Sequence, residues 1–117
     1  MQIRKEQMDA FEQAANRDYE MRLVRFLQSQ FPDAAREREA SLVDGVRPQI
    51  ANARRYGLLT EQQIATYVTS AWLLGSDFDG EFPAAREMLI SGAPADEKSD
   101  WLARFTKALF EQLEQRS

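Results

Sequence analysis

Side chains that could bind a ligand or take part in catalysis are most concentrated between Asp77 and Phe82, where acids alternate with aromatics in Asp-Phe-Asp-Gly-Glu-Phe. A calcium loop beginning at Asp77 would need a bidentate carboxylate at its twelfth position. That position is Met88, and the glycine of such a loop is displaced as well. Glycoside hydrolysis needs two carboxyl groups facing each other across a cleft, and neighbouring acids on one turn do not indicate that arrangement. We therefore expect no metal site and no catalytic residue here, and interpret the stretch as an acidic turn.

The two phenylalanines of this turn have two interpretations. Aromatic side chains dominate binding hot spots, so they would give the turn a surface for a protein partner. Alternatively the rings fold back as plugs on the core, which we favour for at least one of them. The candidate partner-binding residues of the turn are Asp77, Phe78, Asp79, Glu81 and Phe82.

Arg54 and Arg55 form a second group of candidate partner-binding residues, at the predicted end of a helix. Cations suit a helix C-terminus because they meet the negative end of its dipole, which alone explains the pair. The same two guanidinium groups would also suit an acidic partner. A short turn leads from them into another helix, as in a helix-turn-helix DNA reader. However, residues 61–74 contain no lysine or arginine, which argues against binding in a DNA groove.

Histidine and cysteine are both absent from the 117 residues. This excludes disulfides, thiol catalysis and serine–histidine triads, and removes the commonest general base and metal ligand. Residues 1–59 carry 10 basic and 9 acidic side chains, net +1, whereas residues 60–117 carry 5 and 10, net −5. This balance disfavours nucleic-acid binding. No signal peptide or long apolar run is present, so we expect a cytoplasmic, non-enzymatic protein that neither enters a membrane nor holds a cofactor.

Apolar residues recur every three or four positions, which predicts an all-α fold: one domain, 1–117, of about five helices and no sheet. A long first helix is expected from about Arg4 to Gln30, ended by Pro32. Its predicted inward face consists of Met8, Phe11, Ala15, Tyr19, Leu23 and Phe26, widened by Val24 and Leu27. Asp33 is a plausible N-cap for the second helix. That helix is expected over residues 37–56, kinked near Pro48, with its apolar row continuing in phase and Gly57 as its cap.

The third helix has the clearest start, because Thr60 and Gln63 fit a capping box. Its apolar face predicts deep burial up to Gly75. Pro83 suits the first turn of a short fourth helix that ends at Gly92. The last helix is expected over residues 95–115.

Several segments in the same order resemble small helical accessory proteins encoded in bacterial type VI secretion clusters, near genes for VgrG spikes, PAAR tips and effectors. The matching segments are IRKEQM at 3–8, AFEQAA at 10–15, Phe31-Pro32, ARRYG at 53–57 and LGSDFD at 74–79. The resemblance carries over no catalytic residue. It implies an adaptor or co-chaperone that helps an effector, or its PAAR or chaperone partner, to load on the spike.

Three rival functions stay open at the level of sequence. An immunity protein would use its acidic second half to block the basic active site of a neighbouring toxin. A carboxylate-dependent hydrolase would need two acids in one cleft. A plain self-associating helical protein would have no heterologous partner, and the oligomeric state is not determined by the sequence.

Overall fold

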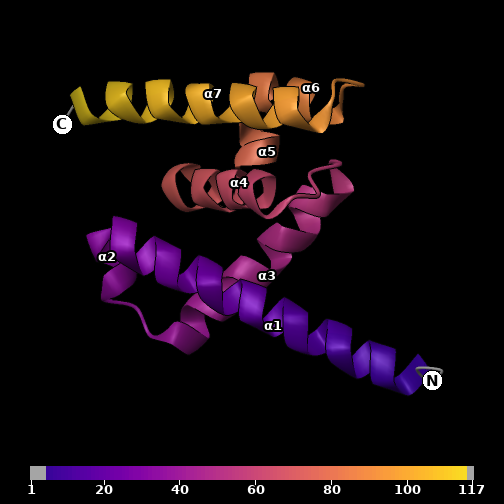
Figure 1. The fold of residues 1–117 in the computed structure, drawn as a ribbon. Coiled ribbons are helices and arrows are strands. Elements are labelled where there is room, and N and C mark those ends of the chain that lie inside the picture. Colours follow the sequence, from indigo (N-terminus) through magenta and orange to yellow (C-terminus); the bar gives the residue numbers. More distant parts are fainter. Residues whose placement is uncertain (1–4, 116–117) are drawn as a thin grey trace. The chain divides into compact units, whose positions relative to one another are not determined.

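The computed structural model describes the backbone of residues 5–115 and the side chains of residues 14–115. The described residues form seven helices and no strand, so the predicted all-α class is confirmed (Figure 1). Two of the seven are four-residue helices that the sequence did not predict, which explains the difference from five. The chain forms two compact units, one ending at Arg47 and the other beginning at Pro48. The single domain expected from the sequence stays a prediction.

In the first unit, α1 (Lys5–Gln30) packs against α2 (Pro32–Ala35). The chain leaves helical geometry at Phe31, which is extended with φ −127° and ψ 118°, because Pro32 follows. Pro32 then occupies the first turn of α2, where its fixed φ suits a helix. Asp33 therefore lies inside this extra turn, and its predicted role as N-cap of the next long helix is wrong.

The buried face of α1 consists of Tyr19, Leu23, Val24 and Leu27. Ala15 and Phe26 were predicted to face inward, but Ala15 is exposed and Phe26 is 43% exposed, since the buried row follows the four-residue step through Leu23 and Leu27. Two further predicted positions, Met8 and Phe11, lie outside the described side chains.

Helix α3 (Glu39–Arg55) runs through Pro48 without interruption. Its predicted apolar row of Leu42, Val46, Ile50 and Ala53 is buried on both sides of the proline, so the phase is kept as expected. The kink itself stays a prediction. Gly57 ends the helix at φ 89°, with its own N–H donating to Arg54 and that of Leu58 donating to Ala53. This is the left-handed glycine cap that the sequence predicted.

The second unit continues with α4 (Glu61–Leu74), α5 (Phe78–Glu81), α6 (Pro83–Ile90) and α7 (Ala95–Gln115). Helix α4 packs along α7, and α5 and α6 pack against each other next to them (Figure 1). The capping box of α4 is confirmed, with Thr60 and Gln63 bonding each other's backbone N–H groups. A buried hydrogen bond of 2.8 Å between the Ser70 and Thr106 hydroxyls joins the middle of α4 to α7.

The stretch predicted as an acidic loop contains α5, a single helical turn. The Asp77 carbonyl accepts hydrogen bonds from the N–H groups of Gly80 and Glu81. Gly75, at φ 116°, ends α4 and turns the chain toward α5. Asp79 and Glu81 thus lie on this short helix, and Asp77 is its N-cap residue.

Candidate interaction surface

The two phenylalanines of α5 have different environments. Phe78 is fully buried, and its ring lies 4.9 Å from that of Tyr67, centroid to centroid. Phe82 is half-buried and contacts Phe105 edge to face at 5.9 Å. The interpretation as a core plug is therefore confirmed for Phe78, whose side chain no partner can reach in this structure. Only Phe82 presents part of its ring to solvent.

The carboxylate of Asp79 is engaged inside the second unit. Its Oδ2 accepts a hydrogen bond of 2.6 Å from the hydroxyl of Tyr56, which fastens α5 to the end of α3. Burial, followed by this hydrogen bond and the negative charge of Asp79, raises the pKa of Tyr56 to about 12. Asp77 and Glu81 remain exposed, as do Arg54 and Arg55. Of the three candidate acids, Asp79 therefore has a structural role, and Asp77 and Glu81 are exposed.

Tyr67 completes an aromatic cluster with Tyr56 and Phe78. Its ring lies 5.9 Å from that of Tyr56, and its hydroxyl is buried without a hydrogen bond of normal geometry. Burial, and after it the negative charge of nearby Asp79, raises the pKa of Tyr67. Both tyrosines therefore stay neutral to a higher pH than a free tyrosine does.

Lys98, on α7, links the ends of α3 and α6 in the same region. It is only 8% exposed, and its Nζ donates to the backbone carbonyl of Tyr56 at 3.0 Å and to that of Leu89 at 2.8 Å. These carbonyls belong to the C-terminal ends of α3 and α6, where a cation also meets the favourable end of each helix dipole. The side chain of Gln63 donates to Asp96 at 2.6 Å, which joins the start of α4 to the start of α7. Four helix ends therefore meet at one end of the second unit.

Two large apolar side chains stay exposed next to these helix ends. Leu59 is 73% exposed and Ile90 is 65% exposed, although each is adjacent in sequence to a fully buried leucine. Arg55 and Arg86 lie close enough to Tyr56 for their positive charges to oppose the rise of its pKa. We call Arg55, Tyr56, Leu59, Arg86 and Ile90 the helix-end surface. It combines exposed aliphatic side chains with arginine and tyrosine, the residue types that binding hot spots favour.

Sequence reasoning pointed to Arg55 and the adjacent Tyr56 but missed Leu59, Arg86 and Ile90 as members of this surface. Lys98 is 42 residues from Tyr56 and nine from Leu89, so no local spacing signals their contact. Leu59 offered a weak signal, because an apolar residue just before an N-cap is a familiar position for local packing. Its high exposure contradicts that role here.

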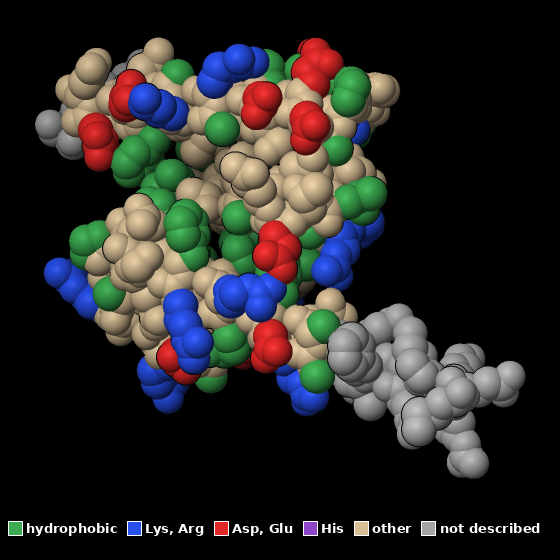
Figure 2. All heavy atoms as spheres, in the orientation of Figure 1, with side chains coloured by type: hydrophobic (Ala, Val, Ile, Leu, Met, Phe, Trp, Pro, Cys, Tyr) green, Lys and Arg blue, Asp and Glu red, His purple; other side chains and the backbone are tan. Residues whose placement is uncertain are grey.

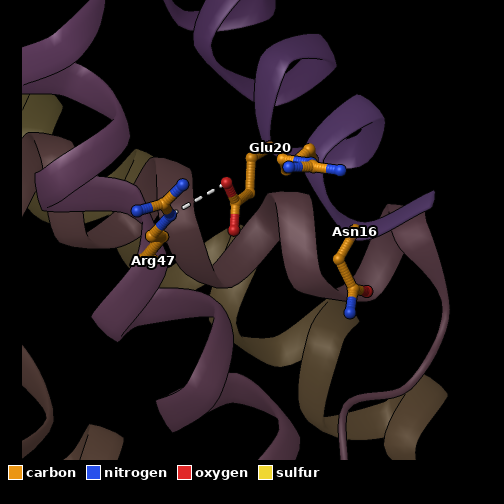
Figure 3. Close-up of a pocket in the computed structure, with 4 residues that line it drawn as sticks. Asn16, Glu20 and Arg47 are labelled. Atoms are coloured by element: carbon orange, nitrogen blue, oxygen red, sulfur yellow. Dashed lines mark hydrogen bonds and ion pairs between the residues drawn. The ribbon is translucent and has the colours of Figure 1, made fainter. Parts of the chain in front are cut away.

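A polar pocket of about 290 Å³ lies in the first unit, lined by Asn16, Arg17, Glu20 and Arg47. Figure 3 shows the side chains of Glu20, on α1, and Arg47, on α3, pointing toward each other, with Nε and Oε2 2.9 Å apart. Glu20 neutralises Arg47, one of the two arginines that line the pocket. We interpret the pair as a structural link between the two helices.

The described residues give no sign of a metal site. Among them, no three acidic side chains are grouped closely enough to hold a metal ion. Of the helices in this part of the chain, none is long and apolar enough to cross a membrane. Charged and apolar side chains are mixed over the face seen in Figure 2. Comparison of the chain with protein-family models, curated proteins and solved structures finds no significant match.

Proposed function

We propose that this protein is a non-enzymatic adaptor or co-chaperone that binds a protein partner through the helix-end surface. The observation that carries the proposal is the exposure of Leu59 and Ile90, at 73% and 65%, beside the cluster of helix ends held by Lys98. Exposed aliphatic groups on a fixed backbone gain free energy when a partner covers them. Little ordering entropy opposes that gain, because the surface is already positioned.

The resemblance to type VI secretion accessory proteins supports the kind of partner. It implies a secretion effector, a PAAR tip or an effector chaperone, which the adaptor would help to load on the spike. Two of the resembling segments, 53–57 and 74–79, supply Arg55, Tyr56 and Asp79 to this region of the structure. The exposed candidates Arg54, Asp77 and Glu81 and the half-buried Phe82 belong to the same unit and stay predicted partner contacts.

The test compares three leucine or isoleucine replacements that add the same charge. Leu59→Asp and Ile90→Asp alter the helix-end surface, whereas Leu113→Asp alters an apolar residue that is 49% exposed near the end of α7. The partner is first captured from the source bacterium, identified, and purified. Its affinity is then measured by calorimetry for each variant whose circular dichroism matches the parent chain.

We expect Leu59→Asp and Ile90→Asp each to weaken the complex at least about tenfold, since a charge would be buried against apolar groups. Leu113→Asp should leave the affinity within about twofold. Equal affinities for all four proteins would refute the helix-end surface as the binding site. Capture of proteins unrelated to secretion would refute the type VI assignment while leaving the surface open to test.

An immunity protein is the second candidate, favoured by the net charge of −5 over residues 60–117. An acidic face would complement the basic active site of a toxin that acts on nucleic acid. Co-expression with the neighbouring toxin separates the two functions, because an immunity protein protects the cell and an adaptor does not. A self-associating helical protein would instead show dimers or larger species by light scattering and no heterologous partner.

A further inference from the structure

A second surface feature lies on the other side of α6, where a shallow groove of about 300 Å³ runs between α6 and α7. Helix α6 contributes Ala84, Glu87 and Met88, its C-cap residue is Ser91, and α7 contributes Trp101. The three positions of α6 and its C-cap Ser91 follow the steps of three and four residues that mark one face of a helix. This face is distinct from the buried face at Ala85 and Leu89 and from the exposed Ile90 of the helix-end surface.

The aromatic wall of the groove is held in place by a chain of ring contacts. Trp101 stacks on Phe105 with centroids 4.8 Å apart and an interplanar angle of 11°, and Phe105 in turn contacts Phe82 edge to face. Rings fixed in this way lose little freedom when a ligand covers them. Met88 on the opposite wall is flexible and adapts to different apolar groups. The groove therefore suits the insertion of an apolar side chain.

The charge at the groove is negative. Glu87 is the charged residue among those that line it, and Glu97 and Asp100 are exposed close to Trp101 in the sequence of α7. The opposing cations on this stretch are Arg104, one turn further along α7, and Lys98, which is buried and donates to backbone carbonyls. Residues 60–117 carry 5 basic and 10 acidic side chains, so the wider field has the same sign. A cationic ligand is thus attracted both at the groove and at longer range.

We propose that this groove binds a basic peptide segment of a partner protein, with one apolar side chain against Trp101 and a lysine or arginine against Glu87. The occupant is fixed by charge complementarity: the apolar walls select the inserted side chain and the acids select its cationic neighbours. A basic segment here and a different surface at the helix ends would let one small chain bridge two proteins. The groove does not depend on the helix-end surface, and its test is separate.

The probe is the synthetic hexapeptide KKLFKK, compared with EELFEE and KKSSKK, all with blocked ends. Binding is followed by two-dimensional NMR of the ¹⁵N-labelled full chain, with Trp72→Phe to leave Trp101 as the single indole. We expect KKLFKK to shift the Trp101 indole N–H and the amides of α6 in a saturable manner. Replacing either the lysines or the apolar pair should weaken binding at least about fivefold, and added salt should weaken it further.

A matched pair of charge reversals locates the contact. Glu87→Lys should weaken KKLFKK about tenfold, whereas Glu111→Lys, an exposed change of the same charge on α7, should change it less than about twofold. Equal effects of the two variants, equal binding of KKLFKK and EELFEE, or an unshifted Trp101 indole would each overturn the proposal. Leu59→Asp should bind KKLFKK as the parent does, so failure here and failure of the helix-end surface are distinguishable.

Discussion

Removing the Phe78 ring should destabilise the fold far more than removing the Phe82 ring, although both belong to one acidic turn. Phe78 is fully buried against Tyr67, so Phe78→Ala loses its transfer free energy and leaves a cavity, at a cost of about 3–5 kcal/mol. For a chain of 117 residues the total stability is about 6–18 kcal/mol. Phe82 is half-buried at the edge of Phe105, and Phe82→Ala should cost about 1–2 kcal/mol.

The assay is urea unfolding at 25 °C, followed by circular dichroism and tryptophan fluorescence. Phe78→Leu serves as the control, since it keeps most of the apolar volume and should lose less stability than Phe78→Ala. The assignment of Phe78 to the core would be refuted by a loss below about 1.5 kcal/mol, or by a loss no larger than that of Phe82→Ala. If Phe78→Ala weakens partner binding, the parallel loss of stability must be compared before that ring is placed at an interface.

Three further predictions concern the polar contacts around the helix ends. Lys98→Met keeps the apolar stem but removes two hydrogen bonds to helix-end carbonyls. It should lower the free energy of unfolding, measured in urea, by about 2–4 kcal/mol. The exposed control Lys107→Met should lower it by less than about 0.5 kcal/mol. Gln63→Ala should lower the free energy of unfolding by about 2 kcal/mol and Thr60→Ala by about 1 kcal/mol, because Gln63 also donates a hydrogen bond to Asp96. Equal losses for the two variants would contradict the link between α4 and α7. The pKa values of Tyr56 and Tyr67 are raised above the unfolded value of about 10, so both tyrosines stabilise the fold below that pH. Stability should then fall as the pH rises from about 10 to about 12, because the unfolded chain loses its tyrosine protons first, and a urea midpoint that is flat across this range would refute the argument.

Features that depend on a few neighbouring residues were predicted correctly. The capping box at Thr60 and Gln63 and the left-handed cap at Gly57 each join groups no more than five residues apart. The apolar row of α3 kept its phase through Pro48, because helical periodicity is a local property of the backbone. The two helices that the sequence did not predict, α2 (Pro32–Ala35) and α5 (Phe78–Glu81), are single helical turns, too short for a periodic pattern to indicate.

The sequence by itself therefore determined the all-α class, the capping box of Thr60 and Gln63, the glycine cap at Gly57 and the absence of histidine and cysteine chemistry. Only the tertiary structure decided which of the two phenylalanines is core and which acid is engaged. Asp79 meets Tyr56 across 23 residues, and Lys98 meets the same tyrosine across 42. The sequence around these residues does not indicate such contacts, because the packing of the helices determines which side chains meet. The same holds for Leu59, just before the N-cap of α4, and Ile90, the last residue of α6, which are apolar like core residues but remain exposed.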